Sequence, residues 1–430
     1  GVSLYPIDNS DLDTLMRHAD QAMYQAKLDG RNRYNLFNTE QDQIYIQKNI
    51  KLKEIQYALE NDELCLYYQP KVNMATGKVF GAEALIRWNH PEKGLIPPLE
   101  FLPVIEGTEL EIQIGHWVIN QALAQLSQWQ EQGIELEISV NISSYHLLSA
   151  LFVDDFEKTL SLYPKVHSKF LQLEILESSA LGDIQLISNI MKICTHALGV
   201  NIALDDFGTG YSSLTHLRNL PIEVIKIDQT FISHVLDDPN DYAIIDSVIG
   251  LADSFNRNVI AEGVETTQHG LMLLLMGCEN AQGYGIARPM PVTDFSEWLN
   301  NYRPNQDWID CANKPRTQKE NKLKIFQLTF AQWQKNFETR IQAPADTEKA
   351  WPILIRTKCH CGVWIKRARQ EMIFEEQSLL KLEKQHDIFH DIADDLFQSY
   401  QEGNISAVSD GLKDFKNAVE HLYSILGQCE

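Results

Sequence analysis

The chain has 430 residues, of which 44% are hydrophobic and 22% are charged, a globular composition with material for two or three domains. Its 59 acidic and 37 basic residues give a formal net charge of -22, which argues against binding nucleic-acid polymers through their backbones. One small phosphate ligand remains compatible with this charge, because bound metal ions invert the local field.

Cysteine usage and hydropathy suggest where the protein works. The seven cysteines are scattered and only Cys359 and Cys361 lie close together, so we expect no disulfide framework and a cytoplasmic location. No run of about 20 apolar residues is present, so we expect no membrane span in this chain. We also expect no signal peptide.

Residues 1–39 are expected to form a strand, a helix and a second strand. The polar cluster Asn9-Ser10-Asp11 precedes a stretch with helical apolar spacing, and Gly30 ends that stretch. The segment is too short to bury a core alone, so we expect it to be the remnant of a larger domain.

Residues 40–300 alternate strand-like and helical patterns. This alternation predicts a parallel barrel or an open parallel sheet, and the number of strands favours an α/β fold of the modified TIM-barrel type. Helical patterns such as 114–130 and 241–254 lie between many of the strands. The expected strands are 65–68, 79–85, 136–142, 170–175, 201–204, 224–227, 258–260 and 281–284.

The last part of the chain loses its strand character. Residues 301–320 are polar and contain two prolines, which predicts a linker. Residues 321–430 carry four helical patterns, over about 322–342, 346–374, 376–402 and 406–427. Four helices in this length predict an antiparallel bundle.

The strands share one habit, because each apolar run ends in an acid or an amide. In a parallel barrel all these ends lie on the face that carries the active site. A single acid at a strand end is more often the N-cap of the following helix than a ligand, but an ordered series is hard to assign to capping. The side chains in question are Glu83, Asn141, Glu174, Glu177, Asp205, Asp206, Asp228, Glu262 and Glu265.

Converging carboxylates repel one another, and metal ions relieve that repulsion. Hard oxygen ligands without a nearby Cys or His favour Mg²⁺ or Mn²⁺. Two such ions suit in-line hydrolysis of a phosphodiester. Lys226 lies in the same set of strands and could orient a water or accept its proton; a structural ion pair is the alternative.

The motifs over residues 40–300 resemble those of the EAL-domain cyclic di-GMP phosphodiesterases. The triplet Glu83-Ala84-Leu85 is weak alone, but further motifs follow it in order. They are YYQPKV (67–72), EALIRW (83–88), VNIS (140–143), LEILES (173–178), DDFGTGYSSL (205–214), IKID (225–228), EGVE (262–265) and QGYGIARP (282–289).

The resemblance implies a role for each matching residue and hydrolysis of cyclic di-GMP to linear pGpG. Glu83, Lys226 and Glu262 would be catalytic, and a homodimer would form near the 207–214 loop. Metal ligands would be Glu83, Asn141, Glu174, Asp205, Asp206 and Glu262; substrate contacts would be Gln69, Arg87, Gln282 and Pro289; and Glu177, Glu265 and Asp228 would stabilise loops.

Two features set limits on this resemblance. Leu176 stands where the family often has Thr, and the glycine of IEGTELE (105–111) is shifted, which puts the rate and the loop in doubt rather than the metal ligands.

Residues 19–37 resemble the end of a GGDEF domain, but the segment with that family's catalytic loop is absent, so the resemblance implies no cyclase activity.

The C-terminal bundle contains a second candidate metal set. His386 and His390 are four residues apart and therefore share one helix face, and with Cys359 they form a candidate Zn²⁺ set. Residues 325–427 resemble the chemoreceptor zinc-binding domain, although Phe330 stands where its first-helix histidine is expected. The fourth ligand could be His360, Cys361, a water or nothing, and a histidine pair without metal is the alternative.

Three functions compete on this evidence. The first is an active phosphodiesterase regulated by zinc or redox change in the bundle. The second is a receptor that binds cyclic di-GMP without cleaving it, and the third is a dimerisation scaffold. Retention of all the metal ligands favours the first over the second, and retention of Gln69 and Arg87 argues against the third.

Overall fold

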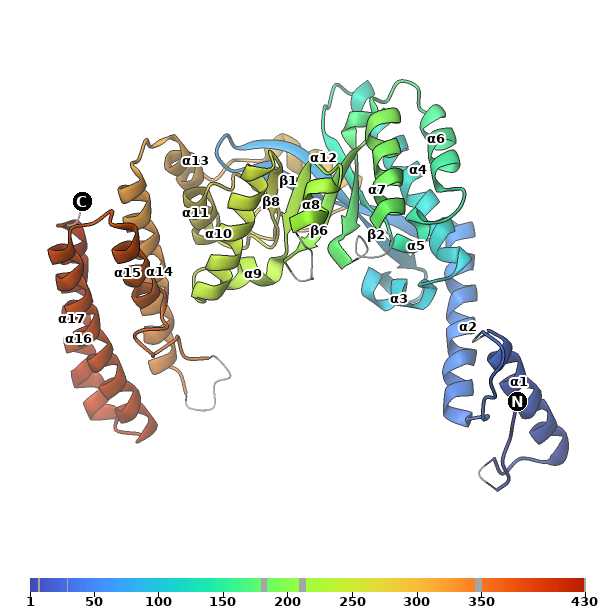
Figure 1. Ribbon diagram of the computed structural model, residues 1–430, viewed down its shortest axis with the longest axis horizontal. Helices are drawn as coiled ribbons and strands as arrows, with labels where there is room; N and C mark the ends of the chain where they lie inside the picture. Colours follow the sequence, from blue (N-terminus) through green and yellow to red (C-terminus); the bar gives the residue numbers. More distant parts are fainter. Residues whose placement is uncertain (7, 29, 179–183, 209–213, 345–349, 429–430) are drawn as a thin grey trace. The chain divides into compact units, whose positions relative to one another are not determined.

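A computed structural model describes the chain apart from residues 7, 29, 179–183, 209–213, 345–349 and 429–430 (Figure 1). The chain divides into two compact units, one made of residues 1–66 and 86–117 and the other of residues 67–85 and 118–430. In the described part of the chain, no helix has the combined length and apolarity that crossing a bilayer requires.

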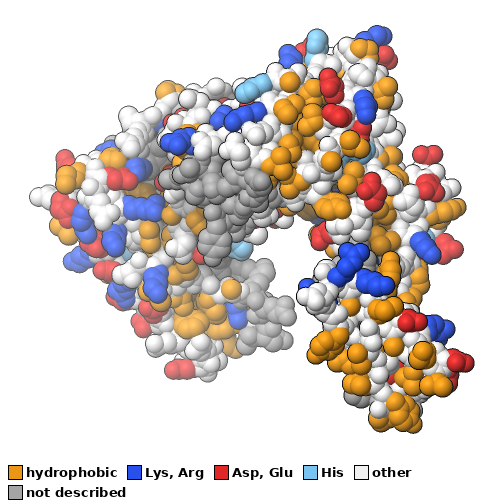
Figure 2. Space-filling model, turned by 45° about the vertical axis from the view of Figure 1, so that its right-hand side comes forward, with side chains coloured by type: hydrophobic (Ala, Val, Ile, Leu, Met, Phe, Trp, Pro, Cys, Tyr) orange, Lys and Arg blue, Asp and Glu red, His pale blue; other side chains and the backbone are white. Residues whose placement is uncertain are grey.

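The N-terminal segment of the first unit is small. Helix α1 (Leu12–Leu28) is flanked by a single parallel bridge between Val2 and Leu36, and α2 (Thr39–Glu60) follows. Figure 2 shows hydrophobic side chains gathered on the surface of this segment, and Leu12 and Tyr34 are each 75% exposed. The expected strand–helix–strand order is present, with each strand reduced to one bridging residue.

Eight strands close into a barrel, which confirms the fold class expected from the sequence. The hydrogen-bonded order is β1-β9-β8-β7-β6-β5-β4-β2-β3, and an additional pairing of β1 with β2 closes the ring. The strands are β1 (Leu64–Asn73), β2 (Lys78–His90), β3 (Gly94–Ile96), β4 (Glu137–Asn141), β5 (Leu171–Leu176), β6 (Asn201–Phe207), β7 (Val224–Ile227), β8 (Asn258–Ala261) and β9 (Asn280–Ala281).

All eight expected strands are present, but the first is inverted. Strand β1 pairs with β9 in antiparallel register, whereas the pairs from β2–β4 through to β8–β9 are parallel. The reason is the short connection after β1, in which Gly77 has φ +71° and Gly77 N donates to Asn73 O over 2.8 Å. A turn of this length joins only antiparallel strands, because a parallel connection needs a crossover. Strand β3 was not expected.

Helices lie between the strands and after them along the chain (Figure 1), and β7 is buried at every position. They are α3 (Leu102–Ile105), α4 (Glu109–Glu131), α5 (Ser144–Leu147), α6 (Phe152–Ser161), α7 (Ile184–Lys192), α8 (Leu214–Asn219), α9 (Gln229–His234), α10 (Pro239–Ser254), α11 (Thr267–Met276), α12 (Val292–Asn301) and α13 (Gln306–Asn313). Short 3₁₀ segments cover Pro98–Glu100 and Ser168–Phe170, and a π-helical turn covers Ile193–Ala197.

The range 301–320, expected to be a polar linker, contains helix α13. Asn305 caps this helix by accepting from Asp307 N and Trp308 N. Trp308 is buried, and its indole nitrogen donates to Thr267 O over 2.9 Å. The prolines and polar residues therefore mark the ends of the helix, while the buried Trp308 packs it onto α11.

The C-terminal region is helical, with α14 (Gln318–Ile341), α15 (His360–Glu371), α16 (Glu376–Gln401) and α17 (Ile405–Gly427). Helix α14 begins with a reciprocal capping box between Thr317 and Glu320. Stacked and edge-on aromatic rings fill the core, among them Phe337 and Phe415, whose centroids are 4.9 Å apart.

The helix expected over 346–374 is shorter than its pattern suggested. Residues 350–359 are not helical, residues 346–349 lie outside the described residues, and α15 starts only at His360. The extended residues supply Trp351 and Ile353, which pack against the bundle core, and Ile353 O accepts from the indole nitrogen of Trp333. The apolar residues of this segment cover the core from an extended backbone, although their spacing also fits one face of a helix.

Candidate active site and a second candidate metal set

Lys226 lies at the centre of the barrel mouth, fully buried on β7. Its ammonium nitrogen is 2.6 Å from a carboxylate oxygen of Glu174 and 2.6 Å from one of Glu262. Oxygens of Asp205 and Glu83 lie 3.2 and 3.6 Å away. Four carboxylates from four strand ends therefore surround one cation, which confirms that these strand ends converge.

Amide side chains hold Glu83 from two sides. Asn141 donates to one carboxylate oxygen of Glu83 over 2.7 Å, and Gln282 donates to the other over 2.7 Å. The same amide group of Gln282 also donates to the Gln69 oxygen over 3.0 Å, and Gln69 in turn donates to the carbonyl oxygen of Ala287. Both oxygens of Glu83 are thereby fixed in orientation before any ligand binds.

The carboxylates fall into two overlapping sets that could each hold a cation. Glu83, Glu174 and Asp205 offer oxygens that all lie within 4.8 Å of one another, and so do Asp205, Asp206 and Glu262. Asp205 belongs to both sets. An oxygen of Glu174 is buried and has no hydrogen-bond partner among the described residues, as expected of an atom that a hard cation would contact. The donor set therefore fits Mg²⁺ or Mn²⁺.

The adjacent acids Asp205 and Asp206 reach the same site because the strand is irregular there. Neighbouring residues of a regular strand point to opposite faces. The register between β6 and β7 shifts between Leu204 and Phe207, and Asp206 has φ +53°, in the left-handed region that Asp tolerates better than most residues. The sequence pair alone did not reveal this bulge.

Burial and mutual repulsion shift the acidity of the cluster. Burial, with Glu83 and Asp205 adding to it, raises the pKa of Glu174 to about 8 despite the opposing charge of Lys226. Burial and the charge of Asp205 raise the pKa of Asp206 to about 6. For Glu83 burial acts upward as well, but Lys226 and two amide donors outweigh it, so its pKa is lowered.

The Lys226 ammonium group responds in the opposite sense. Burial lowers its pKa, but the surrounding carboxylates, Glu174 first, outweigh burial and raise the pKa above its ordinary value. Lys226 therefore remains a cation over the whole physiological range. Its charge offsets part of the repulsion among the acids, which agrees with a role in holding and orienting groups.

The three residues expected to stabilise loops occupy different positions. Glu177 is buried and accepts from Gly208 N over 2.8 Å, which fixes the start of the 207–214 loop; residues 209–213 of that loop lie outside the described residues. Asp228 caps α9 by accepting from Thr230 N over 2.9 Å. Glu265 is exposed and belongs to neither carboxylate set.

The remaining expected substrate contacts lie on β1, on β2 and beside β1. Gln282, directly after β9, donates to both Gln69 and Glu83, as described above. Arg87, four residues after Glu83 on β2, donates to the carbonyl oxygen of Ile86 over 2.8 Å. Pro289 directly precedes Met290, which bridges to Tyr68 of β1.

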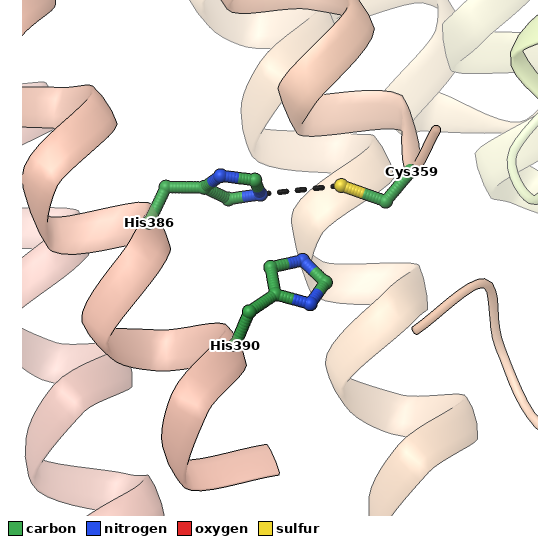
Figure 3. Close-up of side chains that lie close together, drawn as sticks. All are labelled: Cys359, His386 and His390. Atoms are coloured by element: carbon green, nitrogen blue, oxygen red, sulfur yellow. Dashed lines mark hydrogen bonds between the residues drawn. The ribbon is translucent and has the colours of Figure 1, made fainter. Parts of the chain in front are cut away.

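The predicted Cys/His set of the bundle also comes together (Figure 3). The Cys359 sulfur lies 3.2 Å from His386 Nε2, and the rings of His386 and His390 have centroids 4.6 Å apart, one turn along α16. Cys359 is the N-cap of α15, where its sulfur accepts from Gly362 N. All three side chains are buried and offer ligand atoms within 4.8 Å of one another.

Burial keeps these groups neutral without a metal. It raises the pKa of Cys359 to about 11 and lowers that of His386 to about 3, with His390 adding to the latter effect. It lowers the pKa of His390 to about 4, and His390 Nδ1 is buried without a partner among the residues described. Neutral imidazoles and a thiol that a metal can deprotonate are the donors that Zn²⁺ selects.

The candidates for a fourth ligand are now fewer. His360 Nε2 lies 3.1 Å from the carbonyl oxygen of Val235, so that ring contacts the barrel instead of the Cys/His set. Cys361 is buried beside Thr329. Phe330, at the position of the expected histidine, packs edge-on against Phe389. A water remains compatible with the set.

One buried polar group escaped the sequence analysis. Lys71, on β1, is fully buried and donates to Glu137, Ser139 and Gln172. The period of a strand could have revealed it, since Lys71 is two residues from Gln69 and so faces the same side.

The fold and the two carboxylate sets define a TIM-type barrel with a candidate two-cation centre. The chain belongs to the EAL domain family, whose model matches residues 52–289. The model of the diguanylate cyclase GGDEF domain matches residues 1–33. Both assignments confirm the resemblances seen in the motifs.

Individual relatives agree with this assignment. The chain is 40% identical over 292 residues to the bifunctional diguanylate cyclase/cyclic di-GMP phosphodiesterase MucR of Pseudomonas aeruginosa, covering 68% of this chain and 42% of MucR. It is 36% identical over 304 residues to the cyclic di-GMP phosphodiesterase PdeR of Escherichia coli, covering 70% of this chain and 45% of PdeR. The chain thus spans less than half the length of either relative.

A solved structure supports the barrel directly. The PaMucR phosphodiesterase in complex with c-di-GMP superposes with a TM-score of 0.55 at 40% identity, covering 57% of this chain and 99% of that one.

The pH dependence of stability should report the buried acid. Because the pKa of Glu174 is raised to about 8 from an ordinary 4.5, the folded chain holds a proton that the unfolded chain has released between these values. The metal-free protein should therefore lose stability, by at least about 1 kcal/mol, as the pH rises through this window. Thermal unfolding of EDTA-treated protein at several pH values measures the loss.

The variant Glu174→Gln should flatten this pH dependence, while Asp253→Asn, on an exposed part of α10, should leave it unchanged. Parallel slopes for wild type and Glu174→Gln would show that another group causes the loss.

Proposed function

We propose that this chain hydrolyses cyclic di-GMP to linear pGpG with the help of two Mg²⁺ or Mn²⁺ ions. The observation that carries the proposal is the convergence of Glu83, Glu174, Asp205 and Glu262 around Lys226 at the strand ends of an EAL barrel. Relatives named as cyclic di-GMP phosphodiesterases, and a relative's barrel solved with c-di-GMP, support the substrate.

The residues of the site divide the work of catalysis among them. Glu83, Asn141, Glu174 and Asp205 would hold one ion, and Asp205, Asp206 and Glu262 would hold the other. When bound, such ions supply Lewis-acid activation of the phosphodiester and of a water molecule.

Lys226 remains a cation, so we assign it the role of holding Glu174 and Glu262 and orienting the water, rather than accepting a proton. Gln69 and Gln282 would contact the nucleotide from the side of Glu83, to which Gln282 is already bonded. Arg87 would pair with a phosphate oxygen. The homodimer and the cytoplasmic location remain predictions from the sequence.

We also propose that Cys359, His386 and His390 bind Zn²⁺. Three buried donors of the types that zinc selects lie within 4.8 Å of one another, and one imidazole nitrogen has no partner among the described residues. The set lies inside a packed aromatic core, where Trp333 stacks edge-on against His390. Occupancy would tie α15 to α16, since Cys359 begins the first helix and the histidines lie on the second.

Zinc occupancy or oxidation of Cys359 would then regulate the barrel through the residue next to it. His360 contacts Val235 O at the end of α9, and Asn336 of α14 donates to Asp237 over 2.7 Å. The ring of His360 also packs edge-on against Tyr242 of α10. The C-terminal helices therefore contact the segment from the end of α9 to α10 through His360 and Asn336.

Helix α9 lies between these contacts with the C-terminal helices and the carboxylate site. Its N-cap, Asp228, lies two residues after Lys226, and the helix has only six residues. Near its start, Gln229 packs so closely on Gly263, the residue after Glu262, that a Cβ there would lie 2.6 Å from the Gln229 Cβ. A shift of α15 would therefore be transmitted through Val235, α9 and Gly263 to the residues that would hold the ions.

Replacing Asp205 by Asn should abolish pGpG formation, with a loss of at least about 100-fold, because this residue belongs to both cation sets. The assay is incubation with cyclic di-GMP and Mg²⁺ or Mn²⁺ followed by anion-exchange chromatography. Asp253→Asn is the matched control and should keep wild-type activity. If the wild type binds the nucleotide but forms no pGpG, the chain is a receptor and the hydrolase proposal fails.

Metal analysis of the purified protein should find about one zinc per chain. Cys359→Ser should remove most of it, and because Ser is itself a favourable N-cap, this variant isolates the thiolate from the cap. Cys194→Ser, in a buried site of the barrel, is the control that should keep zinc. Zinc-free wild type, purified without chelators, would exclude the site.

Removing zinc with a zinc-selective chelator in excess Mg²⁺ should change the hydrolysis rate of the wild type by at least about twofold. His360→Phe keeps the packing on Tyr242 but removes the contact with Val235 O, so it should keep the basal rate and lose the response. Arg369→Ala cuts ion pairs to Glu376 and Glu383 inside the bundle and should retain the response. A response that survives His360→Phe would rule out this route.

A further inference from the structure

A second lysine lies inside the barrel, one layer of side chains away from the carboxylates. Lys71 is completely buried. Its ammonium group donates to Glu137 over 2.6 Å, to the Ser139 hydroxyl, and to Gln172 over 3.2 Å. Ser139 also donates to Gln172 over 3.1 Å. All three N–H groups of the lysine are therefore used.

The residues around Lys71 stand in a fixed relation to the site above them. Side chains two apart on a strand point to the same face, so the two layers are adjacent rows of one barrel interior. On β4, Ser139 precedes Asn141 by two; on β5, Gln172 precedes Glu174 by two; and on β1, Lys71 follows Gln69 by two, because β1 runs the opposite way.

Strand β2 contacts the Lys71 side chain at a glycine, Gly81. Gly81 lies two residues before Glu83, and a Cβ at Gly81 would stand 3.1 Å from Cε of Lys71 and 2.8 Å from the carbonyl oxygen of Glu137. The glycine makes room for the lysine stem. Lys71, on β1, therefore contacts β2, β4 and β5. It links the four strands that carry Gln69, Glu83, Asn141 and Glu174.

The other half of the same layer is apolar. Ala203, Val224 and Ile260 form a small buried cluster. They precede Asp205, Lys226 and Glu262 by two residues on β6, β7 and β8. Within the described part of the barrel, only the half beneath Glu83, Asn141 and Glu174 rests on a hydrogen-bonded polar network, and such networks fix geometry when every member is satisfied.

We propose that Lys71 is a positioning residue for the metal centre, which acts by tying Ser139 and Gln172 together beneath Asn141 and Glu174 and so fixing the donors of the first cation set. The inference rests on the proposed two-cation site. Among the described residues, Lys71 donates no hydrogen bond to a candidate ligand, and it takes no part in the reaction itself.

The sign of the effect separates positioning from charge. A lysine near a cation site repels the cation, so if Lys71 acted through its charge alone, removing the charge would tighten metal binding. If Lys71 acts by positioning, removing it lets the donors relax, and metal binding weakens. The two mechanisms thus predict opposite changes for the same variant.

The test is equilibrium binding of Mn²⁺ alone, followed by the electron paramagnetic resonance signal of the free ion, on the full chain without nucleotide. Lys71→Met keeps the volume of the side chain and should weaken Mn²⁺ binding at least tenfold. Gln172→Met keeps the charge of Lys71 but cuts its link to β5, so it should weaken binding at least threefold and serves if Lys71→Met does not fold.

Two control variants exclude a general loss of packing and a pure charge effect. Ile260→Val lies in the apolar half of the same layer, two residues before Glu262, and should leave Mn²⁺ affinity within twofold. Glu137→Gln changes the charge next to Lys71 but can still accept its hydrogen bond, and should also stay within twofold. Unchanged or tighter Mn²⁺ binding by Lys71→Met and Gln172→Met would overturn the inference.

The outcome is independent of turnover. A wild type that binds Mn²⁺ but forms no pGpG would end the hydrolase proposal while the Mn²⁺ series still decides the role of Lys71. A wild type that binds no Mn²⁺ would overturn both.

Discussion

The ion cluster around Lys226 is the constraint on which the barrel mouth depends. Carboxylates from four strands can converge only if a positive charge offsets their repulsion, and the buried ammonium group supplies that charge in the chain itself. The balance is incomplete, since the pKa of Glu174 is still raised to about 8. The residual excess of negative charge is the physical reason for proposing that divalent cations bind at this site.

The sequence predicted the parts of the fold that follow from periodicity. Apolar runs located all eight barrel strands, and five of the acids that follow them converge as expected, whereas Glu177, Asp228 and Glu265 lie outside both carboxylate sets. The inverted direction of β1 was missed, because apolar runs carry no direction and only the short turn at Gly77 decides it. The joint approach of Asp205 and Asp206 was missed because it depends on a bulge in β6.

In the C-terminal region, the sequence identified the three candidate zinc ligands but not the secondary structure of the segments before α14 and α15. The i, i+4 spacing placed His386 and His390 on one face, and the structure brings Cys359 to them. Helix α13 and the extended residues before α15 were misjudged, because polar composition does not exclude a helix and apolar spacing does not require one. Burial by Trp308 in the first case, and by Trp351 in the second, decides the local structure.

The space at Gly81 has an evolutionary consequence. A Cβ at position 81 would lie 2.8 Å from the carbonyl oxygen of Glu137 and 3.1 Å from Cε of Lys71, so the size of the residue at 81 is limited by the backbone of β4 and by the lysine stem. Any larger residue at 81 would have to displace Lys71, and a shorter residue at 71 would leave a hole beside an empty position. The residues at 71 and 81 therefore constrain each other's size within the barrel, although they lie on different strands.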